Sequence, residues 1–278
     1  MEGLIPQPYP HKIDKDFRSE LGRINPLFCL LDVATARFAS ELASGGHPAE
    51  FIRAEAKRFD HHWLYTDAVK FTDSRRFLFV SHIAFLLTCA EAACRRLQRH
   101  PLVNKNELNK NEGDFMRRTV RIVLLTASGE QVPNPVPLRD VHNLIGEATF
   151  ATVDYYRLVR NAELHARHVE DSDRSPDEAH QLLPIDSIVR QYKRRPSTPL
   201  EIQFSDVLLC SLALQDMVRR FCAGLLGIDN HIIPHLQKAF GGLPRKRRVN
   251  AAFAFCQQEL LLDEHQAKSV IESIGWLA

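Results

Sequence analysis

Five polar side chains around residue 160 have types and spacings that could act together on a phosphate group. Four of them are three, four and four residues apart, so an α-helix would place them on one face: Asp154, Arg157, Asn161 and His165. Arg160 adjoins Asn161 and can reach around the edge of that face. The segment therefore predicts a guanidinium, a carboxamide and an imidazole close together on one helix.

These groups suit the cleavage of RNA. Histidine exchanges protons near neutral pH, so His165 could take the proton of a ribose 2′-hydroxyl that attacks the adjacent phosphate. The permanently charged guanidinium of Arg160 could bind the phosphate oxygens, on which negative charge gathers in the transition state. Asn161 could orient either partner. Because the ribose supplies the nucleophile, we expect no metal and no cofactor, and DNA should resist cleavage.

The string Arg160-Asn161-Ala162-Glu163-Leu164-His165 resembles the Arg-polar-x-x-x-His signature of the HEPN superfamily. Its context is similar, because the string lies near the end of a long predicted helix and is followed by a loop and a long apolar helix. The resemblance covers about Ser74–Leu226. It implies an all-α, HEPN-like helical bundle and a metal-independent endoribonuclease that leaves 2′,3′-cyclic phosphate and 5′-hydroxyl ends.

The resemblance also implies partners and a role. Members of the superfamily usually form homodimers and build a composite site from two copies of the motif. They often act as toxins or antiviral defence effectors, so an antitoxin or another regulatory protein is an expected partner besides RNA.

The spacing of arginine and histidine is weak evidence by itself, because it recurs in this chain. The other pairs lie in an apolar helix, at a basic helix end and across a proline in a predicted loop: Arg76/His82, Arg95/His100 and Arg174/His180. Only Arg160 is followed by asparagine at the expected point of the expected helix. The context, rather than the spacing, favours the nuclease interpretation.

Two basic clusters offer surfaces for phosphate contacts. The first follows the motif and contains Lys193, Arg194 and Arg195, with Tyr192 placed to stack on an unpaired base. We expect these residues, together with Arg157, to bind RNA. The second cluster is the run at 245–248.

The bulk composition limits the function classes. The 278 residues carry a net charge of only +2, so the chain is no polybasic nucleic-acid coat. Six scattered cysteines without a CxxC pair are typical of a reducing compartment, and the N-terminus lacks the pattern of a secretory signal. The apolar run Phe77–Cys94 contains His82 and reads as a buried core helix. We expect a cytoplasmic protein that does not span a membrane.

Helical periodicity dominates the chain, and no sheet is expected. The predicted helices are 15–44, 48–59, 74–99, 112–127, 138–168 and 205–226, with a mostly irregular segment at 170–199 that holds a short helix at 183–194. Three short helical patterns follow, separated by Pro234, Gly241-Gly242 and Asp263. We predict three parts: an N-terminal helical extension (1–72), a HEPN-like core (73–227) and a small C-terminal appendage (228–278).

Other interpretations remain open. The motif could be a solvated polar helix end, or the fold could be a non-catalytic helical module that dimerises or binds RNA or a partner protein. A DNA-binding regulator using residues 227–278 is a third candidate, although no helix-turn-helix signature is present. Metal ligation by His61-His62 or by His231 and His235 lacks completing ligands, so no metal site is expected.

Overall fold

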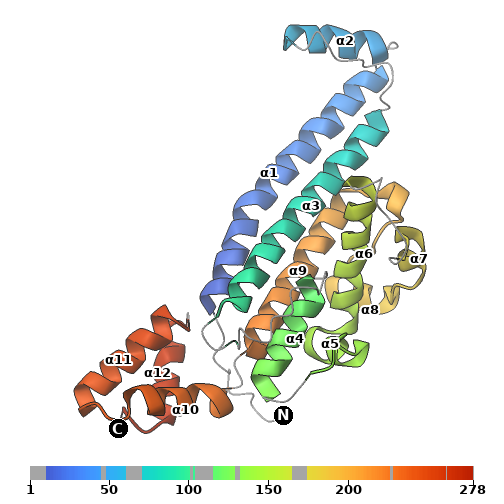
Figure 1. The fold of residues 1–278 in the computed structure, drawn as a ribbon. Coiled ribbons are helices and arrows are strands. Elements are labelled where there is room, and N and C mark those ends of the chain that lie inside the picture. Colours follow the sequence, from blue (N-terminus) through green and yellow to red (C-terminus); the bar gives the residue numbers. More distant parts are fainter. Residues whose placement is uncertain are drawn as a thin grey trace. The chain divides into compact units, whose positions relative to one another are not determined.

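The computed structural model confirms the predicted all-α fold: every regular element among the described residues is a helix (Figure 1). The structure describes residues 11–44, 48–60, 71–100, 103, 115–128, 132–164, 174–225, 228–260 and 262–277. The first four helices lie close to their predicted bounds: α1 (His11–Ser44), α2 (Pro48–Arg58), α3 (Phe71–Gln98) and α4 (Phe115–Ser128). The apolar face at helical spacing explains this agreement, because it alone specifies each helix.

The single helix predicted over 138–168 is wrong. The structure has two helices there, α5 (Leu138–Ile145) and α6 (Glu147–Leu164), separated by Gly146. The φ of Gly146 is +84°, a conformation that glycine adopts readily and other residues rarely do. The predicted end of this helix at His168 lies outside the described residues.

The segment predicted as mostly irregular also differs. Besides α8 (Ile185–Tyr192), which corresponds to the predicted short helix, it contains α7 (Pro176–Gln181) and a 3₁₀ turn, η3 (Pro199–Glu201). Helix α7 begins with a capping box, in which Ser175 and Glu178 exchange side-chain and backbone hydrogen bonds, and Pro176 occupies the first helical position. Both features favour a helix start.

The remaining helices are α9 (Phe204–Leu225), α10 (Ile228–Phe240), α11 (Arg245–Gln258) and α12 (Glu264–Ser273). Pro234 does not separate two helices, as predicted; it lies inside α10. The breaks at Gly241-Gly242 and before Asp263 are where the sequence places them, and Asp263 caps α12 by accepting the backbone N–H of Gln266 at 2.7 Å.

The described residues group into two units, and α1, α3, α6 and α9 contribute to both. The first unit comprises residues 1–19, 87–153 and 212–278; the second comprises 20–86 and 154–211. These groups cut across the three consecutive parts proposed from the sequence, which remain a prediction.

In the second unit α1 and α3 pack side by side (Figure 1). Phe28 of α1 stacks on His82 of α3, with ring centroids 3.8 Å apart, and Arg75 donates to Asp32 at 2.6 Å. Phe79 of α3 in turn lies 6.3 Å, centroid to centroid, from Phe204 at the start of α9. These contacts hold together the part of the fold that carries residues 154–164.

In the first unit α10, α11 and α12 share a small hydrophobic core of their own. Its buried members include Ile232, Leu236, Cys256, Val270 and Ile271. Arg248 of α11 lies over the ring of Trp276, with its guanidinium carbon 4.9 Å from the ring centroid. The C-terminal helices therefore bury apolar surface among themselves.

Helix α3 is the most apolar of the described helices. By length and composition its stretch Arg75–Gln98 could cross a membrane, a test that core helices of soluble proteins also pass. More than half of its most apolar window is buried, including Val80, Ile83 and Leu87. The burial agrees with the prediction of a core helix.

Candidate functional site

Two buried tyrosines fix helix α6 against the rest of its unit. The hydroxyl of Tyr156 donates to Asp206 Oδ1 of α9 at 2.8 Å, and that of Tyr155 donates to the backbone carbonyl of Ser197 at 2.6 Å. Burial raises the pKa of both phenols, and nearby Asp206 raises it further. Both groups therefore stay neutral and serve as hydrogen-bond donors, which orients the opposite, polar face of α6.

Arg160 and Asn161 lie together, as the sequence predicts. Arg160 donates to the Asn161 side-chain oxygen through Nε at 3.0 Å and through Nη2 at 2.9 Å. Both side chains are half-buried. The guanidinium thus engages the oxygen end of the amide, and the Nδ2 end remains the donor end. A guanidinium and an amide N–H held side by side are groups suited to binding phosphate oxygens.

Arg157 and Asp154 form an ion pair one turn earlier on α6. Arg157 Nη2 lies 2.9 Å from Asp154 Oδ1, and Nε donates to the same oxygen at 3.1 Å. Arg157 was predicted to contact RNA; its guanidinium is instead directed along the helix surface to a neighbouring carboxylate. Any phosphate contact of Arg157 would have to compete with this pair.

Arg76 connects the motif to the loop before α9. Its Nη1 donates to Glu163 Oε2 at 2.6 Å, and its Nε donates to the carbonyl of Pro199 at 3.0 Å. Glu163 is the fourth residue of the motif string. The sequence offers no signal for this contact, because Arg76 is remote in the chain and was considered only as part of a chance spacing with His82.

His165 lies outside the described residues, since α6 is described only to Leu164. Its predicted neighbourhood with Arg160 therefore rests on the sequence. It is the fourth residue after Asn161, one helical turn further along the chain.

The basic cluster after the motif follows α8. Lys193 ends that helix in the left-handed conformation, with a φ of +58°, and is exposed. Arg195 is exposed as well, whereas Arg194 is half-buried. Tyr192 is half-buried, and its hydroxyl accepts a hydrogen bond from Gln191 Nε2 at 2.9 Å. The three cations thus lie on the segment leading into the loop that Arg76 and Tyr155 hold.

Asp206 organises that loop from the first turn of α9. This fully buried carboxylate accepts from the backbone N–H of Ser197 at 2.8 Å and from that of Gln203 at 3.0 Å, in addition to Tyr156. Burial next to this carboxylate raises the pKa of the Cys210 thiol, a shift that the Arg160 guanidinium opposes. Cys210 is thus an inert core residue within the electrostatic reach of Arg160.

Sequence reasoning missed Asp206 and the loop residues around it. An acidic residue in the first turn of a predicted helix is a usual signal for a helix start. The signal does not reveal that the carboxylate is buried or that it binds Ser197, nine residues earlier. His180 was considered only in a chance spacing with Arg174, although Ser175-Pro176-Asp177-Glu178 is a recognisable capping box.

Within the described part of the chain, no group of three or more histidine, cysteine or acidic side chains could hold a metal ion. His61-His62 lies outside that part, and His235 is exposed on α10. Comparison with known proteins adds no assignment: no family model, no curated protein and no solved structure matches this chain.

Proposed function

We propose that this protein is a metal-independent endoribonuclease of the HEPN type, with His165 as general base, Arg160 as phosphate-binding residue and Asn161 as orienting residue. The observation that carries the proposal is the pairing of Arg160 with Asn161, whose side-chain oxygen accepts two guanidinium N–H groups. The pair holds two phosphate-binding groups one helical turn before the motif histidine.

The proposed reaction balances without a cofactor. His165 takes the proton of the ribose 2′-hydroxyl, and the 2′-oxygen forms a bond to phosphorus. The bond from phosphorus to the 5′-oxygen breaks, and the leaving oxygen takes up a proton. The products are a 2′,3′-cyclic phosphate and a 5′-hydroxyl, and Arg160 stabilises the charge on the phosphate oxygens in the transition state.

The rigidity of α6 supports this assignment, because a phosphate-binding group must be held in place to act. Tyr155, Tyr156 and Glu163 each make a hydrogen bond to a different segment of the same unit. Together they fix the rotation of the helix that presents Arg160.

The test is cleavage of an unstructured RNA in the presence of EDTA. We expect the full chain to cleave it and His165→Ala and Arg160→Ala to lose at least about a hundredfold in rate. Exposed His235 and Arg37 provide matched controls, and His235→Ala and Arg37→Ala should cleave at the wild-type rate. DNA of the same sequence should stay intact. Equal cleavage by all five proteins, or cleavage by none, would contradict the proposal.

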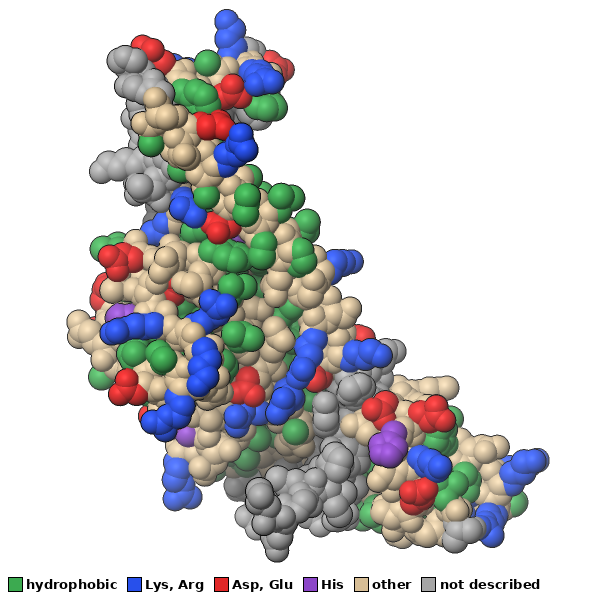
Figure 2. All heavy atoms as spheres, turned by 180° about the vertical axis from the view of Figure 1, so that it is seen from behind, with side chains coloured by type: hydrophobic (Ala, Val, Ile, Leu, Met, Phe, Trp, Pro, Cys, Tyr) green, Lys and Arg blue, Asp and Glu red, His purple; other side chains and the backbone are tan. Residues whose placement is uncertain are grey.

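A non-catalytic interaction module is the second candidate, and exposed apolar residues on α1 favour it. Leu27, Leu30 and Val33 are 56%, 64% and 64% exposed, and Leu31 is 42% exposed. Figure 2 shows hydrophobic side chains gathered on the surface around the long helices. Such a patch is typical of a protein interface.

Under either candidate we propose that a second copy covers the α1 patch in a homodimer. Sedimentation of wild type against Leu30→Glu tests this, with a shift to monomer expected for the variant. By the resemblance we further propose a cytoplasmic toxin or defence effector under the control of a neutralising partner.

A further inference from the structure

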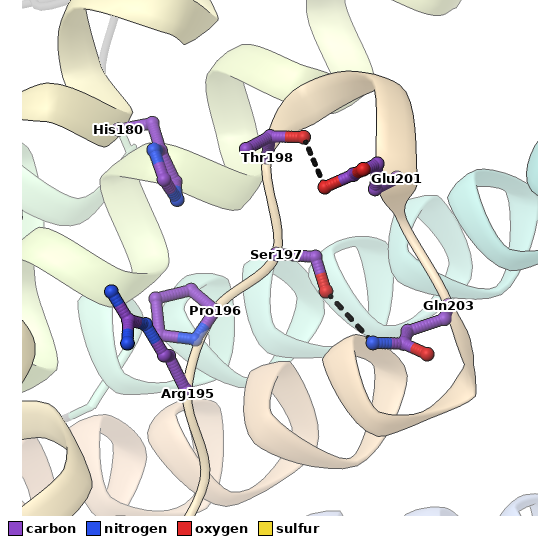
Figure 3. Close-up of a pocket in the computed structure, with 7 residues that line it drawn as sticks. All are labelled: His180, Arg195, Pro196, Ser197, Thr198, Glu201 and Gln203. Carbon is purple, nitrogen blue, oxygen red and sulfur yellow. Dashed lines mark hydrogen bonds between the residues drawn. The ribbon is translucent and has the colours of Figure 1, made fainter.

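The loop between α8 and α9 forms one side of a polar hollow of about 580 Å³ (Figure 3). Sites for small organic ligands usually measure about 300–1,000 Å³. Seven residues line it, six from the loop and its 3₁₀ turn and one from α7: Arg195, Pro196, Ser197, Thr198, Glu201, Gln203 and His180. All of them belong to the second unit.

The wall of the hollow is held rigidly by the buried groups behind it. Ser197 donates its backbone N–H to Asp206 at 2.8 Å and accepts the Tyr155 hydroxyl at its carbonyl at 2.6 Å. Its side-chain oxygen accepts from Gln203 Nε2 at 3.1 Å. The Ser197 hydroxyl and the Gln203 amide are therefore fixed in place before any ligand arrives, which lowers the entropic cost of binding.

Two nitrogen-bearing side chains occupy the other side. Figure 3 shows His180 and Arg195 pointing toward one another on either side of Pro196. The His180 ring packs on Tyr155, with centroids 5.5 Å apart, and its Nε2 is buried without a hydrogen-bond partner among the described residues. A buried ring nitrogen without a partner is costly unless a ligand satisfies it. Beside a guanidinium, the ligand group that fits is an anionic oxygen.

The remaining lining groups suit a sugar. Thr198 donates its hydroxyl to Glu201 Oε2 at 3.0 Å, so hydroxyl, amide and carboxylate groups alternate along the loop. Neighbouring donors and acceptors of this kind bind the vicinal hydroxyls of a ribose. A ligand that carries both an anionic phosphate and a ribose is a nucleotide.

We propose that this hollow binds a nucleotide, with its phosphate between His180 and Arg195 and its ribose against Ser197, Glu201 and Gln203. The nucleotide could come from an RNA strand or be free in solution. The RNA source is favoured by Arg76, which ties the loop at Pro199 to Glu163 within the motif. For that source the inference rests on the proposed ribonuclease function and names the subsite that holds a nucleotide beside the scissile one.

Binding can be measured on the full chain with a fluorescent 2′-O-methyl oligonucleotide, which lacks the nucleophile and cannot be cleaved. We expect Arg195→Ala and His180→Asn each to weaken binding by about tenfold, the loss of one charged or buried hydrogen bond. Arg190 on α8 is exposed and does not line the hollow, so Arg190→Ala is the matched control and should bind within about twofold of wild type. Thermal melting of each variant checks that it is folded.

A second arm uses adenosine monophosphate alone, measured by calorimetry. Binding that is lost in both Arg195→Ala and His180→Asn identifies a free nucleotide as a sufficient ligand. Oligonucleotide binding with the same dependence, and none of the mononucleotide, identifies the strand. Wild-type binding of both ligands by the two folded variants would overturn the inference.

The outcome is distinguishable from that of the nuclease proposal. If His165→Ala abolishes cleavage while the two hollow variants bind the oligonucleotide normally, the nuclease assignment stands and the nucleotide site fails. If no protein cleaves RNA but the hollow variants still weaken binding, the nucleotide site stands and the nuclease assignment fails.

Discussion

Arg76 of α3 and Glu163 of α6 form an ion pair inside the RNA-cleavage motif string, with Nη1 and Oε2 2.6 Å apart. The same guanidinium donates to Pro199, so one side chain holds both the motif helix and the loop of the proposed nucleotide site. Both partners are about three-quarters buried, at 24% and 26% side-chain exposure. The relationship makes Arg76 a positioning residue for both sites.

A double-mutant cycle should reveal this coupling. We expect Arg76→Met and Glu163→Gln to interact by about 1 kcal/mol in the free energy of unfolding, because the pair is partly shielded from solvent. Arg37 and Glu41 on α1 are the control, being 82% and 49% exposed at 3.1 Å, and their coupling should stay near about 0.3 kcal/mol. Equal couplings in urea unfolding would show that the Arg76 pair has no special role.

Asp206 should be among the most sensitive residues of its unit. Asp206→Ala leaves the Tyr156 hydroxyl and the backbone N–H groups of Ser197 and Gln203 without their acceptor. We expect a loss of about 3 kcal/mol in stability, and about 1 kcal/mol for Tyr156→Phe, which removes one donor. Asp186→Ala, an exposed first-turn acid on α8, should change stability by less than about 0.5 kcal/mol. Chemical denaturation measures all three, and a Tyr156→Phe loss as large as that of Asp206→Ala would contradict the shared-acceptor account.

Two glycines within helices should respond in opposite directions to alanine. A Cβ on Gly224 would lie 2.7 Å from Leu144 Cδ1 and 2.8 Å from Val123 Cγ1, so the close packing of α9 must shift. We expect Gly224→Ala to lower stability by about 1 kcal/mol. A Cβ on Gly22 of α1 meets nothing within 4 Å, so Gly22→Ala should raise stability by about 0.5–1 kcal/mol. Thermal melting that moves both variants in the same direction would count against this packing.

Acid should destabilise the first unit through His100. This side chain is 2% exposed, and burial lowers its pKa from 6.5 to about 4, an effect that its contact with the Leu260 carbonyl opposes. Between those two values the unfolded chain binds a proton that the folded chain does not. Stability is therefore complete above pH 6.5 and falls as the pH drops toward 4, by about 2 kcal/mol between pH 7 and pH 5.

His100→Gln should remove this part of the pH dependence, because glutamine does not titrate. His235→Gln is the control, since His235 is exposed, and should retain the wild-type slope. Urea unfolding at pH 7 and pH 5 provides the comparison. An unchanged slope in His100→Gln would show that other groups cause the acid sensitivity.

The sequence by itself determined the helices and the neighbours within one helix. Apolar residues at helical spacing give α2, α4 and α9 to within a few residues, because that spacing alone specifies a buried face. The closeness of Arg160 and Asn161 follows in the same way, since both belong to one turn. The break at Gly146 escaped prediction because glycine tolerates a helical φ as readily as the positive φ found here.

Only the tertiary structure decided which distant groups meet. Arg76 reaches Glu163, 87 residues away, and Tyr156 reaches Asp206, 50 residues away. Local propensity carries no information on such pairs, because they depend on how whole helices pack. The hollow lined by His180 and Arg195 arises in the same way, from a loop held by the buried carboxylate of Asp206. The motif was therefore visible in the sequence, whereas the groups that hold it and the proposed nucleotide site beside it became visible only in the fold.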